Sequence, residues 1–126
     1  MKYMLLIYAD EQASSEPERQ ACYQESTQLA HTLKSSGHFL TTSPLQSVST
    51  ATTVRVREGK RLVTDGPFAE TREQLGGFFM IEAKNLDEAI DIAGRIPAGH
   101  WGTIEIRPVL EITDLPPVRT AEVTRA

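Results

Sequence analysis

The sequence contains one cysteine, Cys22, among its 126 residues. No disulfide can form within the chain, and a zinc site built on several cysteines is excluded. The three histidines, His31, His38 and His100, do not show the spacing of metal ligands on one helix face. We therefore predict no metal site.

Long apolar runs are also absent. The run at residues 3–8 is followed by Asp10 and Glu11, without a small-residue cleavage site. It is shorter than a membrane span or the apolar core of a signal peptide. We therefore expect no membrane partner and a cytoplasmic location.

Basic clusters are short, and the formal net charge is −4. A nucleic-acid-binding protein needs a basic face that contacts many phosphates. The nearest approach is Arg55, Arg57, Lys60 and Arg61, which the pattern places on the exposed side of a hairpin. Phosphate-loop and dinucleotide glycine patterns are missing as well. We predict neither a nucleic-acid partner nor a cofactor.

The order of apolar patterns predicts an α+β domain. Helix start signals at Ser15 and Asn85 and stop signals at Gly37 and Pro97 define two helices. Strands are expected at residues 3–8, 38–48, 52–57, 60–64, 78–81 and 102–107. This order is a ferredoxin-like β-α-β-β-α-β pattern with a hairpin elaboration. We expect one domain over residues 1–112 and a loose tail over 113–126.

The strands at 3–8 and 78–81 are apolar on both faces. Two helices can cover only one face of such a sheet, so the other face needs a cover. A second copy of the chain, packed sheet to sheet, is the simplest solution. The patterning thus predicts a homodimer.

Residues 63–83 (VTDGPFAETREQLGGFFMIEA) closely resemble the signature of the DGPF branch of the YCII-related family. The resemblance extends over 2–8, 51–57, 86–89 and 102–108. It implies a dimeric α+β barrel, in which two ferredoxin-like sheets face each other across a cleft. Members of this branch are often encoded beside sigma factors of the extracytoplasmic-function type, which implies a possible sigma-factor link.

Many YCII-related proteins carry a histidine in the first helix and an aspartate just before the proline that ends the second. Alignment on Gly37 and Pro97 puts these positions near Ser26 and on Ile96. Neither residue is a general acid or base at ordinary pH. The resemblance therefore does not carry a hydrolase or lyase activity to this chain.

Asp65 is the catalytic candidate, since a carboxylate at a strand end beside a cleft can accept a proton or bind a polar ligand group. The simpler alternative is that Asp65 nucleates a turn through its own backbone. Glu105 and Arg107 either face the cleft or form an ion pair. The predicted ligand-binding residues are Asp65, Gly66, Pro67, Phe68, Glu70, Thr71, Phe78, Met80, Glu105 and Arg107.

No specific reaction follows from these residues. We carry three hypotheses: a small-molecule binding or catalytic module with its cleft at the sheet interface, a non-enzymatic interaction protein linked to a sigma factor, and a dimerisation scaffold.

Overall fold

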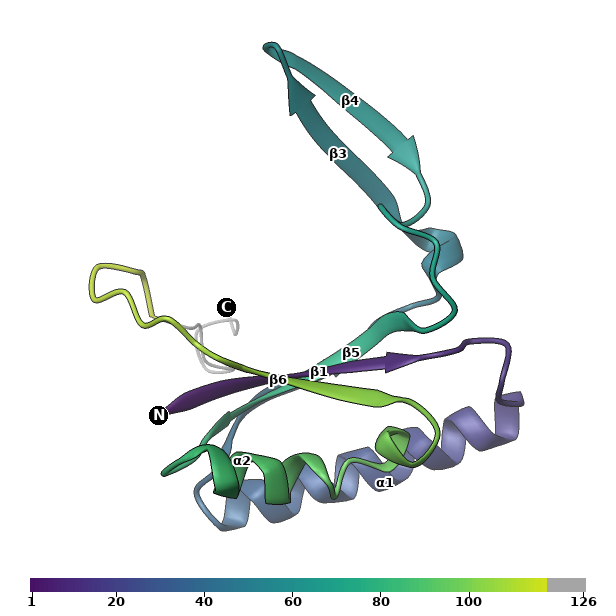
Figure 1. The fold of residues 1–126 in the computed structure, drawn as a ribbon. Coiled ribbons are helices and arrows are strands. Elements are labelled where there is room, and N and C mark those ends of the chain that lie inside the picture. Colours follow the sequence, from purple (N-terminus) through teal and green to yellow (C-terminus); the bar gives the residue numbers. More distant parts are fainter. Residues whose placement is uncertain (118–126) are drawn as a thin grey trace, which may run out of the picture.

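A computed structural model describes residues 1–117 of the chain. A four-stranded antiparallel sheet, in the order β2-β5-β1-β6, carries two helices on one face (Figure 1). The elements of this layer are β1 (Lys2–Ala9), α1 (Glu16–Ser35), β2 (Phe39–Pro44), β5 (Gln74–Glu82), α2 (Leu86–Ala93) and β6 (Thr103–Pro108). The α+β class is confirmed, and the arrangement fits a ferredoxin-like fold. The expected loose tail lies outside the described residues from 118 onward.

Both helices begin at the residues that the sequence predicts. The Glu18 backbone N–H donates to Ser15 Oγ at 3.3 Å, and the Ser15 N–H donates to Glu18 Oε1 at 2.7 Å. At α2, the Glu88 N–H donates to Asn85 Oδ1 at 2.9 Å. Each bond satisfies an N–H group that the helix itself leaves free. Gly37 follows α1 with a φ of 83°, a left-handed conformation that glycine adopts without strain.

The capping box of α1 predicts a specific pH dependence. Two hydrogen bonds lower the pKa of Glu18. The larger effect comes from the bond with the Ser15 backbone, and the smaller from the bond with the Ser15 side chain. Because this pKa is lower in the folded state, the ionised Glu18 stabilises the protein at pH values above the pKa of an ordinary carboxyl group. This stabilisation is lost as the pH falls through the pKa of the folded state. In urea unfolding at several pH values, Glu18→Ala should be less stable than wild type at pH 7, and the gap should close in acid.

Glu25→Ala is the matched control, because Glu25 lies on the same helix and its side chain makes no hydrogen bond within residues 1–117. An equal pH dependence for both variants would contradict the capping role of Glu18.

The core lies between the helices and one end of the sheet. Tyr3 and Leu5 of β1 pair with Ile81 and Phe79 of β5, and all four are buried. The helices contribute the buried residues Leu29, Leu33, Ala89, Ile92 and Ala93, and Ile96 follows α2. Large side chains thus fill the space where β1 begins and β5 ends. This face positions α1 against the sheet.

The opposite face of the sheet, which we call the open face, carries no helix within residues 1–117 (Figure 1). Met4 and Leu6 of β1 and Phe78 and Met80 of β5 lie on it and are half-buried. The expectation of strands that are apolar on both sides is therefore confirmed for β1 and β5.

The predicted hairpin forms a separate two-stranded sheet of β3 (Thr52–Arg57) and β4 (Lys60–Asp65), which we call the arm. It projects away from the four-stranded sheet on the side of the open face (Figure 1). At its base the Gly66 N–H donates to the Ala51 carbonyl at 2.8 Å, and Thr53 Oγ1 donates to the Gly66 carbonyl at 2.7 Å. Gly66 has a φ of 99°, which a side chain would strain.

Two strand boundaries differ from the prediction. β2 ends at Pro44, and a short 3₁₀ helix, η1 (Val48–Thr50), begins at the last residue of the predicted strand. Proline has no N–H for a further ladder bond. β5 begins at Gln74, four residues before the expected start, so it includes Gly76 and Gly77. Glycine weakens the sequence signal of a strand, but in this protein it allows β5 to approach β2 closely.

Candidate functional site

The structure divides the predicted site residues among three places. Asp65 ends β4 and is exposed at the base of the arm, and Phe68 beside it is 79% exposed. Four loop residues line a shallow groove: Gly66, Pro67, Glu70 and Thr71. The remaining four lie on the strands of the sheet: Phe78, Met80, Glu105 and Arg107. Within one chain, these residues do not form a single cleft.

Hydrogen bonds within the chain engage two polar residues of the 66–73 loop, Thr71 and Glu73. Gln74 Nε2 donates to the Thr71 carbonyl at 2.8 Å, and Thr71 Oγ1 donates to the Glu73 carbonyl at 2.7 Å. Glu73 Oε1 accepts from Thr103 Oγ1 at 2.7 Å, which ties the loop to β6. Thr71, Glu73 and Gln74 of the 63–83 signature therefore have an architectural role, since they fix the path from the arm back into the sheet.

A polar group crosses β1 and β6 on the open face. Tyr8 Oη donates to Glu105 Oε1 at 3.1 Å, and Arg107 Nη1 lies 3.7 Å from Glu105 Oε2. Burial, followed by the bond to Glu105, raises the pKa of Tyr8, so the phenol remains a donor. Glu105 and Arg107 thus form an ion pair within one chain, and their position in a dimer cleft stays a prediction. Sequence reasoning missed Tyr8, although alternation along β1 places it on the face of Met4 and Leu6.

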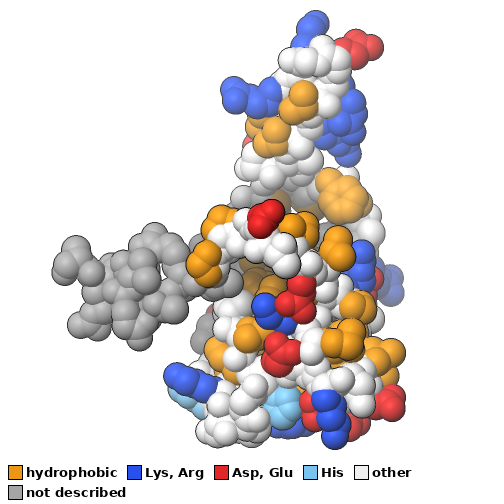
Figure 2. Space-filling view, turned by 90° about the vertical axis from the view of Figure 1, so that its left-hand side faces the viewer, with side chains coloured by type: hydrophobic (Ala, Val, Ile, Leu, Met, Phe, Trp, Pro, Cys, Tyr) orange, Lys and Arg blue, Asp and Glu red, His pale blue; other side chains and the backbone are white. Residues whose placement is uncertain are grey.

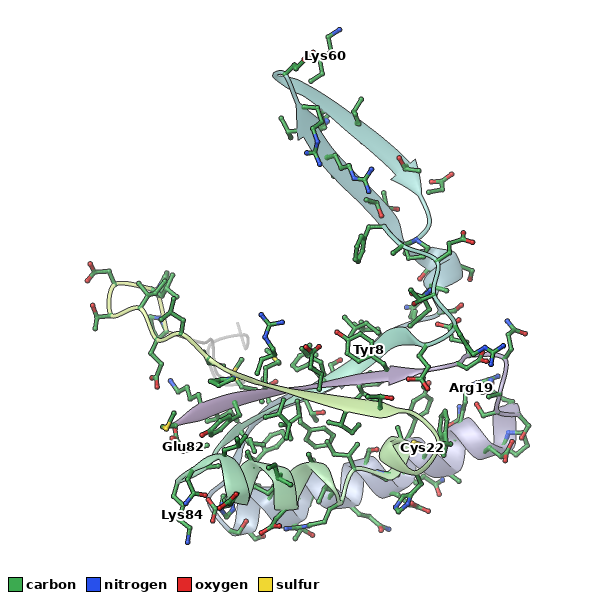
Figure 3. All side chains as sticks on the ribbon, in the orientation of Figure 1. Tyr8, Arg19, Cys22, Lys60, Glu82 and Lys84 are labelled. Carbon is green, nitrogen blue, oxygen red and sulfur yellow. The ribbon has the colours of Figure 1, made fainter. Side chains whose placement is uncertain are left out.

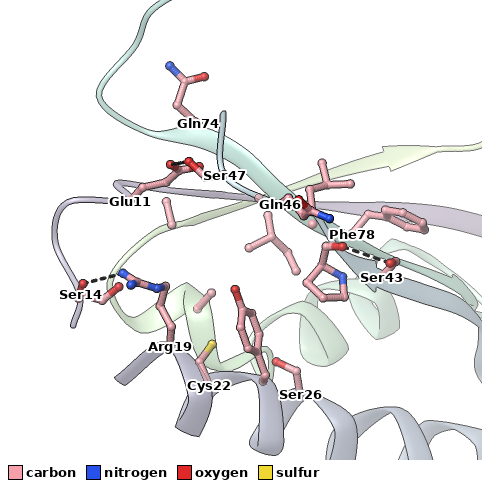
Figure 4. Close-up of a pocket in the computed structure, with 18 of the residues that line it drawn as sticks. Glu11, Ser14, Arg19, Cys22, Ser26, Ser43, Gln46, Ser47, Gln74 and Phe78 are labelled. Atoms are coloured by element: carbon pink, nitrogen blue, oxygen red, sulfur yellow. Dashed lines mark hydrogen bonds between the residues drawn. The ribbon is translucent and has the colours of Figure 1, made fainter. Parts of the chain in front are cut away.

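A cavity of about 710 Å³ lies between the N-terminal half of α1 and the nearby strand ends; we call it the α1 cavity (Figure 4). The cavity exists because α1 and β5 carry small residues at this end of the sheet, whereas they carry large residues at the end that forms the core. On α1 these are Cys22 and Ser26, in line with the buried Leu29 and Leu33. On β5 Gly77 is in line with Phe79 and Ile81, and Gly76 precedes it at a register irregularity.

The size of the α1 cavity is within the range of small-molecule sites, which are mostly apolar with a few polar groups. Its apolar lining comes from Ile7, Leu45, Phe79, Ala98 and Trp101. Among its polar residues, Arg19 reaches the mouth from α1 (Figures 3 and 4). Arg19 Nη1 donates to the Ser14 carbonyl at 2.8 Å, and Nη2 donates to Glu16 Oε2 at 2.6 Å. The cavity can therefore surround an apolar body and offer one guanidinium.

The rim of the cavity joins two loops that are far apart in the sequence. Glu11 accepts from Ser47 Oγ at 2.8 Å and from the Val48 N–H at 3.0 Å. Glu11 thus ties the β1–α1 loop to the start of η1 and to the segment that leads into the arm. Ser14 Oγ in the same loop is buried and has no hydrogen-bond partner within residues 1–117.

Cys22 lines the cavity and is half-buried. Burial raises the pKa of the Cys22 thiol, partly opposed by a hydrogen bond with Ser26. A protonated thiol is a poor nucleophile, so Cys22 acts as part of the wall. In the sequence, the small residues at 22, 26, 76 and 77 were the features that could have indicated this cavity. That they face one another is visible only in the packed structure.

Within residues 1–117, no group of three or more histidine, cysteine, aspartate or glutamate side chains is placed to hold a metal ion. His38 Nε2 lies 3.2 Å from Glu88 Oε1, a carboxylate partner that the sequence did not indicate. Of the described helices, none is both long and apolar enough to cross a membrane.

Comparison with known proteins identifies the family. The YCII-related domain matches residues 1–113. An uncharacterized protein of Rhizobium meliloti (strain 1021) is 33% identical over 114 residues, which cover 86% of this chain and 92% of that protein. The match spans β1 to β6 and therefore includes the α1 cavity, the arm and the open face. The chain belongs to the YCII-related family.

Proposed function

We propose that this protein binds a small molecule with an apolar body and one acidic or polar group in the α1 cavity. The observation that carries the proposal is the cavity of about 710 Å³ between the core-facing side of α1 and the glycines of β5. The helix position that aligns with the histidine of many YCII-related proteins, near Ser26, lines the same cavity.

The charges around the cavity limit the ligand. Arg19 has five N–H donors, of which the Ser14 and Glu16 bonds use only part. Asp10, Glu11 and Glu16 also line the mouth and would repel a ligand with several negative charges. We therefore expect a ligand with at most one acidic group. No catalytic step is proposed, because burial raises the pKa of the Cys22 thiol and so makes it a poor nucleophile at neutral pH.

A thermal-shift screen of metabolites, run on wild type and Asp65→Asn in parallel, tests this site. Monocarboxylates with an apolar body should raise the melting temperature of both proteins by mass action. Asp65 is exposed and is not among the cavity residues, so the substitution should leave the shift intact. The alternative, in which Asp65 contacts the ligand or accepts a proton, predicts that the shift disappears in a folded Asp65→Asn protein.

We also propose that two copies of the chain pack through their open faces, as the patterning and the resemblance to the DGPF branch predict. The half-buried Met4, Leu6, Phe78 and Met80 support this, because a second sheet would remove them from water. In this homodimer the Tyr8–Glu105–Arg107 group would lie at the interface, where the dimeric α+β barrel has its cleft.

The arm favours a second candidate function, an interaction protein. It exposes both apolar and basic side chains, and the resemblance to the DGPF branch suggests a sigma factor of the extracytoplasmic-function type as the partner. Size-exclusion chromatography of the full chain with such a sigma factor from the same organism would test it. Co-elution that is lost on removal of the arm's basic charge would support this function, and separate elution would reject it.

A further inference from the structure

The arm exposes an unusual amount of apolar surface. Val56 is 61% and Val63 is 60% exposed. In the β3–β4 register Val54 faces Val63 and Val56 faces Arg61, so the three valines share one face of the hairpin. A two-stranded hairpin alone is marginally stable in water. The arm therefore has a face of three valines and Arg61 that no other element within residues 1–117 covers.

The other face of the arm is basic. Arg55, Arg57 and Lys60 share it, and Arg57 lies directly opposite Lys60 across the two strands. Like charges in such a pair destabilise a hairpin. Figure 3 places Lys60 at the far end of the arm, and Figure 2 shows blue and orange side chains together there. A partner with apolar and acidic groups would relieve both features.

The segment after β6, residues 109–117, has the complementary character. Leu110 is 81%, Ile112 55% and Leu115 61% exposed, and Glu111 and Asp114 lie between them. A salt bridge of 3.5 Å from Lys2 to Glu111 holds the start of this segment to β1. Like the arm, the segment lies on the open-face side, but at the opposite end of the sheet (Figure 1).

Two-fold symmetry relates these surfaces, provided that the open faces form the homodimer proposed above. If the two-fold axis lies in the interface and runs along the strands, the two basic arms lie at the same end of the dimer. If the axis instead runs across the strands, each arm lies at the end of the dimer where the partner's 109–117 segment lies. The second arrangement pairs opposite charges, whereas the first pairs like charges, which costs free energy.

We propose that each arm crosses the dimer interface and packs against residues 109–117 of the partner subunit. The valine face covers apolar surface of the partner, and the basic face lies beside the carboxylates of the segment. The contact is isologous, so it occurs twice and closes the dimer.

Charge exchange tests the pairing. We expect each of two double variants to raise the dimer dissociation constant about tenfold or more in sedimentation equilibrium. One variant carries Arg55→Glu and Arg57→Glu in the arm, and the other carries Glu111→Arg and Asp114→Arg in the segment. The protein that carries all four substitutions should return to within about threefold of wild type, because the charges are exchanged. Failure of this rescue, with every variant folded by circular dichroism, would overturn the pairing.

Cross-linking tests the direction. In a Cys22→Ser background, a chain with Arg57→Cys is mixed with a differently tagged chain with Glu111→Cys, and a bismaleimide is added. We expect a covalent pair that carries both tags. Cross-links only between two Arg57→Cys chains would show the other axis and reject the arm exchange while leaving the dimer intact. A monomer of 14.0 kDa for wild type at micromolar concentration would reject the homodimer and the arm exchange together.

Discussion

Replacing Ser26 by leucine should abolish binding in the α1 cavity without loss of stability. Ser26 lines the cavity on α1, opposite the glycines of β5. A leucine there would occupy space that is free in the wild type and would contact apolar lining such as Phe79. Burial of the added side chain should leave the free energy of unfolding unchanged or raise it by about 1 kcal/mol.

The measurement is titration with 1-anilinonaphthalene-8-sulfonate, an apolar probe with one negative charge. Wild type should bind it saturably, and Ser26→Leu should lose that component. Gln28→Leu is the matched control, because Gln28 is an exposed residue of the same helix that does not line the cavity. Equal binding by all three proteins would place the probe elsewhere, with the apolar face of the arm as the obvious site.

Gly102→Ala should destabilise the protein strongly, although it adds only one methyl group. Gly102 precedes β6, and its N–H donates to the Ala98 carbonyl at 2.7 Å. A Cβ at this position would collide with the Tyr8 carbonyl oxygen and would lie 3.0 Å from that of Ala98. Both contacts are to backbone, so the end of β1 or the turn before β6 would have to move. We expect a loss of about 3 kcal/mol in urea unfolding.

Gly94→Ala is the control for this substitution. Gly94 follows α2 with helical dihedral angles, and a Cβ there would be 3.6 Å from its nearest neighbours. The free energy of unfolding should change by less than about 1 kcal/mol. Similar stabilities for the two variants would mean that β1 and β6 are not held as closely as the structure shows.

Local signals were sufficient to predict most of the fold. Ser15 with Glu18 and Asn85 with Glu88 marked both helix starts, because a cap involves only neighbouring residues. The order of elements indicated a ferredoxin-like sheet, and the two-sided apolar pattern of β1 and β5 indicated that the helices leave one of its faces uncovered. Asp65 ends β4 opposite Thr52, and Gly66 redirects the chain at the base of the arm, while the role of the Asp65 side chain stays a prediction.

The candidate site depends on contacts that are distant in the sequence, and it was therefore missed. The α1 cavity forms because Cys22 and Ser26 face Gly76 and Gly77 across about fifty residues of chain. Periodicity places each pair on a face, but it does not indicate that two small pairs meet. Likewise, alternation predicted the hairpin but not its projection away from the sheet.

Amide chemical shifts of the ¹⁵N-labelled protein during titration with 1-anilinonaphthalene-8-sulfonate would test the α1 cavity most directly. We expect saturable shifts that cluster at Cys22, Ser26, Gly76 and Gly77, with little change in the arm. Shifts confined to residues 52–65 and the open face, or no saturable shift at all, would contradict binding in the cavity.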